Sequence, residues 1–184
     1  MKTALLLIDI QNDYLPGGKM VLEGSLEAGQ KAKRLLEYFR KERFPRVHVQ
    51  HVSKRAGATF LLSDTDGVQF HESVRPAKLE TVIQKHYPNA FRDTRLLSFL
   101  RESRVQGLVI TGMMTHLCVD ATVRAASEHG FECWIAGDAC ATKALTYQGK
   151  TIPAGAVQGA FLAALDGTYG KVMNAEDIIF QGVD

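Results

Sequence analysis

The chain has 184 residues, and its 22 basic and 20 acidic residues leave a formal net charge of +2. This balance argues against nucleic-acid or membrane-surface binding, both of which normally need a basic excess on one face. The composition, 46% hydrophobic and 23% charged, is typical of a globular protein whose single core is large enough to fold without disulfides or metal. No repeat or linker-like stretch interrupts the chain, so one domain over residues 1–184 is expected.

The N-terminal segment predicts a buried strand. Residues 3–10 (TALLLIDI) are almost all apolar, and the run lacks the length and the small-residue cleavage site of a signal peptide. An amphipathic helix is expected over residues 25–43, where Leu35, Leu36 and Phe39 recur at helical spacing. The basic residues of this helix are interpreted as a solvated face.

The middle of the chain alternates short apolar runs with a helical pattern. Residues 46–52 predict a strand, and the Gly- and Pro-containing residues 53–80 predict a loop with one helical turn. Residues 81–85 predict a short strand. A helix is expected over residues 93–103, for which Asp93 offers an N-cap.

The C-terminal half continues the alternation. The expected elements are a strand over 107–112, a helix over 115–129 that ends at Gly130, a strand over 131–137, a helix over 155–165 and a strand over 171–173. Strands that are apolar throughout and alternate with helices indicate a parallel sheet covered on both faces. The predicted fold class is therefore α/β, a three-layer α/β/α arrangement around a mostly parallel, Rossmann-like sheet of about six strands.

Polar residues with different chemistries stand at the carboxyl ends of the predicted strands. Asp9 ends the first strand, Lys85 ends the strand over 81–85, and the strand over 107–112 leads to Cys118. Asp138 follows the strand over 131–137. Because ligands of open parallel sheets bind beyond the carboxyl ends of the strands, these residues are candidates for a functional site.

Cys118 lies in the first turn of its predicted helix. There the helix dipole and the unpaired N–H groups favour an anion, which lowers the pKa of a thiol and enriches the thiolate. The backbone N–H groups of Met114 and Cys118 are then placed to bind a developing oxyanion. A small cysteine buried in the core fits this segment equally well.

Asp9 and Lys85 each allow a functional and a structural interpretation. A carboxylate at the end of an apolar strand is costly unless it is paired, so Asp9 is either a base that takes the thiol proton or a loop-capping residue. Lys85 is either an ordinary surface lysine or a buried ammonium that pairs with Asp9 and stabilises a thiolate at Cys118.

Four motifs in this order resemble the isochorismatase-like cysteine hydrolases, a group that includes nicotinamidases and N-carbamoylsarcosine amidohydrolases. The motifs are LLLIDIQNDY, VIQKHYPNAF, VITGMMTHLCVDATVRAA and GDACAT. The resemblance implies the catalytic triad Asp9, Lys85 and Cys118. It also implies a cis peptide at Met113–Met114 that aims the N–H groups of Met114 and Cys118 at an oxyanion.

The resemblance further implies hydrolysis of a small amide, carbamoyl or ureido substrate through a thioester on Cys118, without a cofactor. Substrate contacts are expected from Gln11, Tyr14, Phe91 and His116, although Phe91 fits a core position equally well. Residues 146–155 (TYQGKTIPAG) form either a wall of the site or a link between two elements. Dimers or tetramers are common among the proteins that the chain resembles, so a homo-oligomer is expected.

The chain departs from the nicotinamidase pattern at the metal site. Nicotinamidases carry an Asp-x-His pair after the second strand, where this chain reads VQHVSKRAG. His48 and His51, three residues apart on a strand, face opposite sides, and His71 lies in a separate loop. No catalytic metal is therefore predicted, which also weakens nicotinamide as the substrate.

Three other functions remain open. Isochorismatase-type hydrolysis of a vinyl ether would not need Cys118, and a catalytically silent member would act as a binding protein. A redox-responsive thiol protein is disfavoured because no second cysteine lies in a C-x-x-C spacing with Cys118. The three cysteines do not suggest a disulfide framework, and a reduced, cytoplasmic setting is expected.

Overall fold

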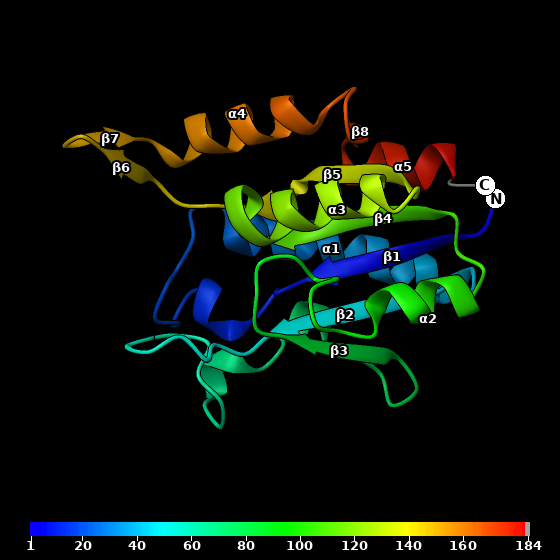
Figure 1. Ribbon diagram of the computed structural model, residues 1–184, viewed down its shortest axis with the longest axis horizontal. Helices are drawn as coiled ribbons and strands as arrows, with labels where there is room; N and C mark the ends of the chain where they lie inside the picture. Colours follow the sequence, from blue (N-terminus) through cyan, green and yellow to red (C-terminus); the bar gives the residue numbers. More distant parts are fainter. Residues whose placement is uncertain (183–184) are drawn as a thin grey trace.

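Six parallel strands form the central sheet of the computed structural model, which describes residues 1–182 (Figure 1). Their order across the sheet is β3-β2-β1-β4-β5-β8. The strands are β1 (Thr3–Ile8), β2 (Arg46–His51), β3 (Thr81–Lys85), β4 (Gly107–Met113), β5 (Glu132–Ala141) and β8 (Lys171–Met173). All of their carboxyl ends lie along one edge of the sheet, because every pairing is parallel.

Helices cover both faces of the sheet. One face carries α1 (Ser25–Lys41) and α5 (Ala175–Gln181), which contact each other and β5. The opposite face carries α2 (Leu96–Glu102), α3 (Asp120–Glu128) and α4 (Ala154–Leu165) (Figure 1). The three-layer α/β/α fold predicted from the sequence is confirmed.

The sequence of β1 shows why the sheet needs two helical layers. Leu5 and Leu7 belong to the core beneath α1, whereas Leu6 and Ile8 belong to the core beneath α2 and α3. These four side chains are at most 1% exposed. A strand buried on both faces has no polar side to alternate with, which explains its continuous apolar run.

Most predicted elements are present, and several regions differ from the prediction. The loop over 53–80 contains two 3-10 turns, η2 (Asp66–Val68) and η3 (Glu72–Val74), where one turn was expected. The predicted helix over 115–129 begins as a π-helical turn, η4 (Thr115–Val119), before α3. Helix α5 and the hairpin of β6 (Leu145–Tyr147) and β7 (Lys150–Ile152), which projects beyond the sheet in Figure 1, were not predicted.

The predicted N-cap role of Asp93 is wrong. Helix α2 begins at Leu96, and Asp93 has a left-handed φ of 55° with an exposed side chain. The N-cap position is Arg95, whose side chain makes no capping bond, and the hydroxyl of Thr94 just before it accepts a hydrogen bond from the N–H of Leu96 at 3.2 Å.

Close packing against β1 dictates a glycine at position 112 of β4. Its φ is +141°, and a Cβ at this position would lie 2.0 Å from the carbonyl oxygen of Ile8. Only glycine permits β4 to approach β1 this closely just before Met113 and Met114.

In residues 1–182, no helix is both long and apolar enough to span a bilayer.

Candidate active site

Asp9, Lys85 and Cys118 meet at the carboxyl edge of the sheet. The ammonium of Lys85 donates to Asp9 Oδ2 at 2.7 Å and to Cys118 Sγ at 3.3 Å. The residues are 0%, 1% and 5% exposed, respectively. The sheet thus brings together a carboxylate, an ammonium and a thiol that lie up to 109 positions apart in the chain, with Asp9 at one extreme and Cys118 at the other.

The end of β1 determines the position of the Asp9 carboxylate. Asp9 follows β1 directly and has a left-handed φ of 53°, a conformation that Asp tolerates better than most residues. Its N–H donates to the carbonyl of Val49 at 3.0 Å, and its carbonyl accepts from the N–H of Gln11 at 2.9 Å. The chain therefore leaves the sheet at this residue with both backbone groups satisfied.

A cis peptide joins Met113 to Met114, as the resemblance implied. In the turn that follows, the N–H groups of Leu117 and Val119 both donate to the carbonyl of Met114, at 3.1 and 3.2 Å. Within residues 1–182, the N–H groups of Met114 and Cys118 donate to no carbonyl outside η4. Neither N–H group is thus engaged by the carbonyl of a neighbouring element.

The environment of the Cys118 side chain favours the thiol over the thiolate. Burial raises its pKa well above the usual range, and the carboxylate of Asp9 raises it further, whereas Lys85 opposes this rise. The expectation that the helix N-terminus enriches the thiolate is therefore wrong for this structure. Cys118 is 5% exposed in a π-helical turn, and burial is the largest cause of its raised pKa.

The other groups around the thiol keep defined charges. Burial alone would lower the pKa of Lys85, but Asp9 and Cys118 outweigh it and raise that pKa, so the ammonium stays charged. Burial and then Lys85 lower the pKa of His51 to about 4, so its imidazole is neutral at neutral pH. Burial raises the pKa of Tyr14, with Cys118 and Asp9 adding to the effect, so Tyr14 keeps its phenolic proton.

Two of the four expected substrate contacts lie next to the triad and have different surroundings. Gln11 is fully buried, and its carboxamide accepts from the N–H of His51 at 2.8 Å and donates to the carbonyls of His51 and Val68 at 2.9 and 2.6 Å. Its amide protons are thus both used on the backbone. Tyr14 is 2% exposed, packs against Phe60, and feels the charges of the triad.

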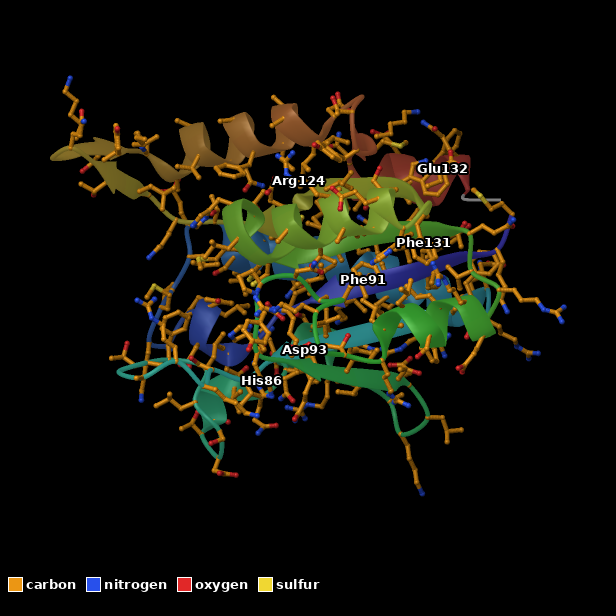
Figure 2. All side chains as sticks on the ribbon, in the orientation of Figure 1. His86, Phe91, Asp93, Arg124, Phe131 and Glu132 are labelled. Atoms are coloured by element: carbon orange, nitrogen blue, oxygen red, sulfur yellow. The ribbon has the colours of Figure 1, made fainter. Side chains whose placement is uncertain are left out.

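The structure does not bring Phe91 to the site. Its ring packs against His129 and stacks on Phe131, with centroids 5.0 and 6.2 Å away (Figure 2). His129 follows the end of α3 and Phe131 precedes β5, so this aromatic cluster belongs to the edge opposite the triad. The VIQKHYPNAF motif thus contributes Lys85 to the site but not Phe91.

His116 and Asp138 lie near the rim and support neighbouring elements. His116 is half-buried, bonds through Nδ1 to the hydroxyl of Thr142, and packs against Phe161 of α4. Asp138 lies within β5, where its carboxylate accepts from the N–H of Ala175 at 2.7 Å and so caps α5. The sequence placed Asp138 after a strand because it predicted β5 to end four residues too early.

His51 contacts the triad, which was not predicted from the sequence. Its Nδ1 lies 3.0 Å from the Lys85 ammonium. His51 was considered only as a metal-ligand candidate. The usable signal was its position as the last residue of β2, which pairs in register with Lys85, the last residue of β3.

A divalent metal ion does not fit among the atoms of the triad and His51. Asp9, His51 and Cys118 offer ligand-type atoms within 4.8 Å of one another. However, the Lys85 ammonium is in hydrogen-bond contact with all three residues, at 2.7, 3.0 and 3.3 Å, respectively. A divalent cation among these atoms would face a fixed positive charge within contact distance, so the ammonium already supplies the cation of this cluster.

The isochorismatase domain matches residues 3–164. The chain belongs to the isochorismatase family. It is 51% identical to an uncharacterized isochorismatase family protein of Bacillus subtilis, YddQ, over 176 residues that cover 96% of this chain and 98% of the relative. A crystal structure of an isochorismatase-type hydrolase from Oleispira antarctica superposes with a TM-score of 0.94 at 44% identity, covering 97% of this chain and 96% of the other.

More distant relatives in the family carry the names of hydrolases. Streptothricin hydrolase of Streptomyces noursei is 31% identical over 139 residues, which are 76% of this chain and 49% of the relative. Maleamate amidohydrolase of Pseudomonas putida is 29% identical over 144 residues, which are 71% of this chain and 68% of the relative. N-carbamoylsarcosine amidase of an Arthrobacter species is 37% identical over 71 residues, which are 39% of this chain and 27% of the relative. Family membership supports a hydrolase.

Proposed function

We propose that this isochorismatase-family hydrolase cleaves a small amide, carbamoyl or ureido substrate, a linear C–N bond, through a thioester on Cys118. The observation that carries the proposal is the buried contact of one ammonium with both a carboxylate and a thiol, at 2.7 and 3.3 Å. A protonated thiol beside a carboxylate is a nucleophile with its own base, the arrangement that cysteine hydrolases need. The names of the amidase relatives favour the same bond type.

The first half of the reaction forms the thioester. Asp9 takes the proton of Cys118 as the sulfur attacks the carbonyl carbon, and the N–H groups of Met114 and Cys118 bind the resulting oxyanion. The Lys85 ammonium offsets the negative charge as that charge moves from the Asp9 carboxylate to the substrate oxygen. When the intermediate collapses, the C–N bond breaks and the Asp9 proton leaves with the nitrogen as ammonia or an amine.

The second half of the reaction returns the enzyme to its starting state. The carboxylate of Asp9 takes a proton from water, whose oxygen attacks the thioester carbon. The C–S bond breaks, the acid product leaves, and Asp9 gives the proton back to the sulfur of Cys118. No redox partner and no cofactor is required, because every proton taken by Asp9 is returned within the cycle.

The test is ammonia release from a panel of small amides and ureido acids, headed by maleamate, N-carbamoylsarcosine, ureidoacrylate and nicotinamide. Turnover that persists in the presence of a chelator and is lost in Cys118→Ala supports the proposal. Turnover of a vinyl ether by both wild type and Cys118→Ala would favour the isochorismatase-type alternative. Tight binding of a panel compound without turnover would favour a binding protein instead.

We also propose that the chain forms a homo-oligomer. Helix α4 is almost entirely apolar in sequence and yet half of its residues are exposed to solvent: Gly155, Ala156, Gly159, Ala160, Ala163 and Ala164. A helix that is apolar all round is normally covered, and a second copy of this chain is the occupant that we expect. Sedimentation velocity of the wild type and of Ala160→Glu compares their oligomeric states, and a wild-type monomer would contradict the proposal.

The cytoplasmic setting also remains a prediction.

A further inference from the structure

The Lys85 ammonium has three N–H donors and meets three acceptors. Two of them, Asp9 Oδ2 and Cys118 Sγ, belong to the triad, and the third is His51 Nδ1 at 3.0 Å. Lys85 is 1% exposed, so water cannot replace a lost partner. A buried donor left without an acceptor costs stability, and the third acceptor therefore fixes where the ammonium lies.

Because an ammonium only donates, the contact with Lys85 determines the tautomer of His51. Nδ1 must carry the lone pair, and the ring proton of the neutral imidazole must be on Nε2. A protonated imidazole would place two positive groups 3.0 Å apart. The groups that act on this ring are Lys85 and His86, which disfavour the imidazolium, and Asp9, which favours it.

The backbone of His51 is held on both sides. Gln11 uses its carboxamide to bind the N–H and the carbonyl of His51, at 2.8 and 2.9 Å. The register of β2 against β3 places His51 opposite Lys85. The fully buried Gln11 thus aligns His51, whose ring contacts the Lys85 ammonium. This alignment explains why the carboxamide of Gln11 is hydrogen-bonded to the backbone.

We propose that His51 is a positioning residue of this site: its Nδ1 accepts the third proton of the Lys85 ammonium and so aims that charge at Asp9 and Cys118. The effect on turnover rests on the hydrolase function proposed above. The tautomer and charge of His51 do not depend on it, and they can be measured without a substrate.

The first test is ¹⁵N NMR of histidine-labelled protein between pH 5.5 and 8, with the His51 signals assigned by their loss in His51→Asn. The expected spectrum shows a neutral ring with its proton on Nε2 over this whole range. In Lys85→Met, the pKa of His51 should rise, because a neighbouring cation has been removed. A proton on Nδ1, a charged ring at pH 6, or a pKa that does not respond to Lys85→Met would overturn the proposal.

The second test separates positioning from substrate contact. In His51→Asn the side-chain oxygen can replace Nδ1 as the acceptor, whereas His51→Leu removes the acceptor. With a substrate identified from the panel, we expect kcat to fall on the order of 10-fold or more in His51→Leu, to stay within about fivefold in His51→Asn, and KM to change little in either. His71→Leu, in a loop where the ring bonds to Ser73, is the matched control and should behave as wild type. Wild-type kcat in His51→Leu, or a raised KM with unchanged kcat in both variants, would contradict the positioning role.

Discussion

Two ionic clusters lie at opposite ends of β3, and each includes one histidine of β2. At the start of β3, the Glu80 carboxylate accepts from Arg40, from Arg46 at 2.6 Å, from His48 at 2.9 Å and from the N–H of Ala77 at 2.9 Å. The Glu80 side chain is 2% exposed, and burial, which would raise its pKa, is outweighed by these donors, which lower it. Every position around this carboxylate is occupied by a fixed donor.

The Lys85 cluster at the end of β3 is not saturated. Asp9 Oδ1 is buried and has no ordinary hydrogen-bond partner among residues 1–182, and a carboxylate oxygen of Asp9 lies within 4.8 Å of the Cys118 sulfur. Burial raises the pKa of the Cys118 thiol, and among residues 1–182 the N–H groups of Met114 and Cys118 have no carbonyl partner outside η4. The two carboxylates therefore differ: both oxygens of Glu80 accept hydrogen bonds and hold a structural cluster together, whereas Asp9 keeps an unpartnered oxygen beside a thiol.

Lys85→Met should give the largest contrast between the clusters. It removes the charge that compensates both Asp9 and the oxyanion, so we expect kcat to fall on the order of 10³-fold. Steady-state kinetics on a panel substrate measures this, with Lys31→Met as the control, because Lys31 makes only a surface pair with Asp138 at 3.8 Å. Near wild-type turnover in Lys85→Met would remove Lys85 from the catalytic group.

Glu80→Gln should destabilise the protein and leave the chemistry intact. It leaves Arg40 and Arg46 without their shared carboxylate, and we expect a loss of about 3 kcal/mol in the free energy of unfolding with kcat essentially unchanged. Urea denaturation measures the first quantity. An equal loss of kcat at full folding would show that the two clusters are coupled.

The Glu80 cluster also predicts a pH dependence of stability. Because the folded-state pKa of Glu80 is below its unfolded value of about 4.3, its contribution is complete above that value and is lost as the pH falls further. Urea midpoints from pH 7 down to pH 3 should therefore fall less steeply in Glu80→Gln than in wild type. Parallel curves for the two proteins would contradict this assignment.

Asp9→Asn should uncouple the reactivity of the thiol from turnover. The Asp9 carboxylate raises the pKa of Cys118 and Lys85 lowers it, so removing the carboxylate lowers the pKa and increases the thiolate fraction at pH 7. We expect iodoacetamide to alkylate Cys118 several-fold faster while hydrolysis is lost. Peptide mass spectrometry distinguishes this site from Cys133 and Cys140, and slower alkylation would show that Asp9 does not act on the thiol in this way.

The smallest effects should come from the aromatic residues. Phe91→Leu changes a cluster remote from the triad, and we expect KM to stay within about twofold of wild type while stability falls by about 1 kcal/mol. Tyr14→Phe removes a phenol next to Asp9 and Cys118 and should change KM or kcat more than Phe91→Leu does. The reverse order would restore Phe91 as a substrate contact.

The fold and the proximity of Asp9, Lys85 and Cys118 could be predicted, because local runs of apolar residues indicate which strands are buried and where they end. The continuous apolar runs of β1 and β4 indicate a sheet covered on both faces, and the parallel order places their carboxyl ends at one edge. The short β6–β7 hairpin and α5 carry no comparably long apolar pattern and were missed.

What the sequence could not provide is the balance of forces at each residue. The low thiol pKa expected for Cys118 rested on the start of a helix and on the Lys85 ammonium, whereas burial and Asp9 raise that pKa in the folded protein. The roles of Gln11 and Phe91 depend on partners 40 positions away in the chain, namely His51 and Phe131. Motif position brought both residues near Asp9 and Lys85 in sequence, but side-chain direction decides what they contact.

The most direct test of the proposed chemistry is rapid-quench mass spectrometry of the protein during turnover of a panel substrate that releases ammonia. We expect a transient adduct with the mass of the acyl group, located by peptide mapping on Cys118 and formed no more slowly than ammonia. The adduct and ammonia release should both be absent in Cys118→Ala. Ammonia release at the wild-type rate by Cys118→Ala, or turnover in wild type with the acyl group on another residue, would contradict the central claim.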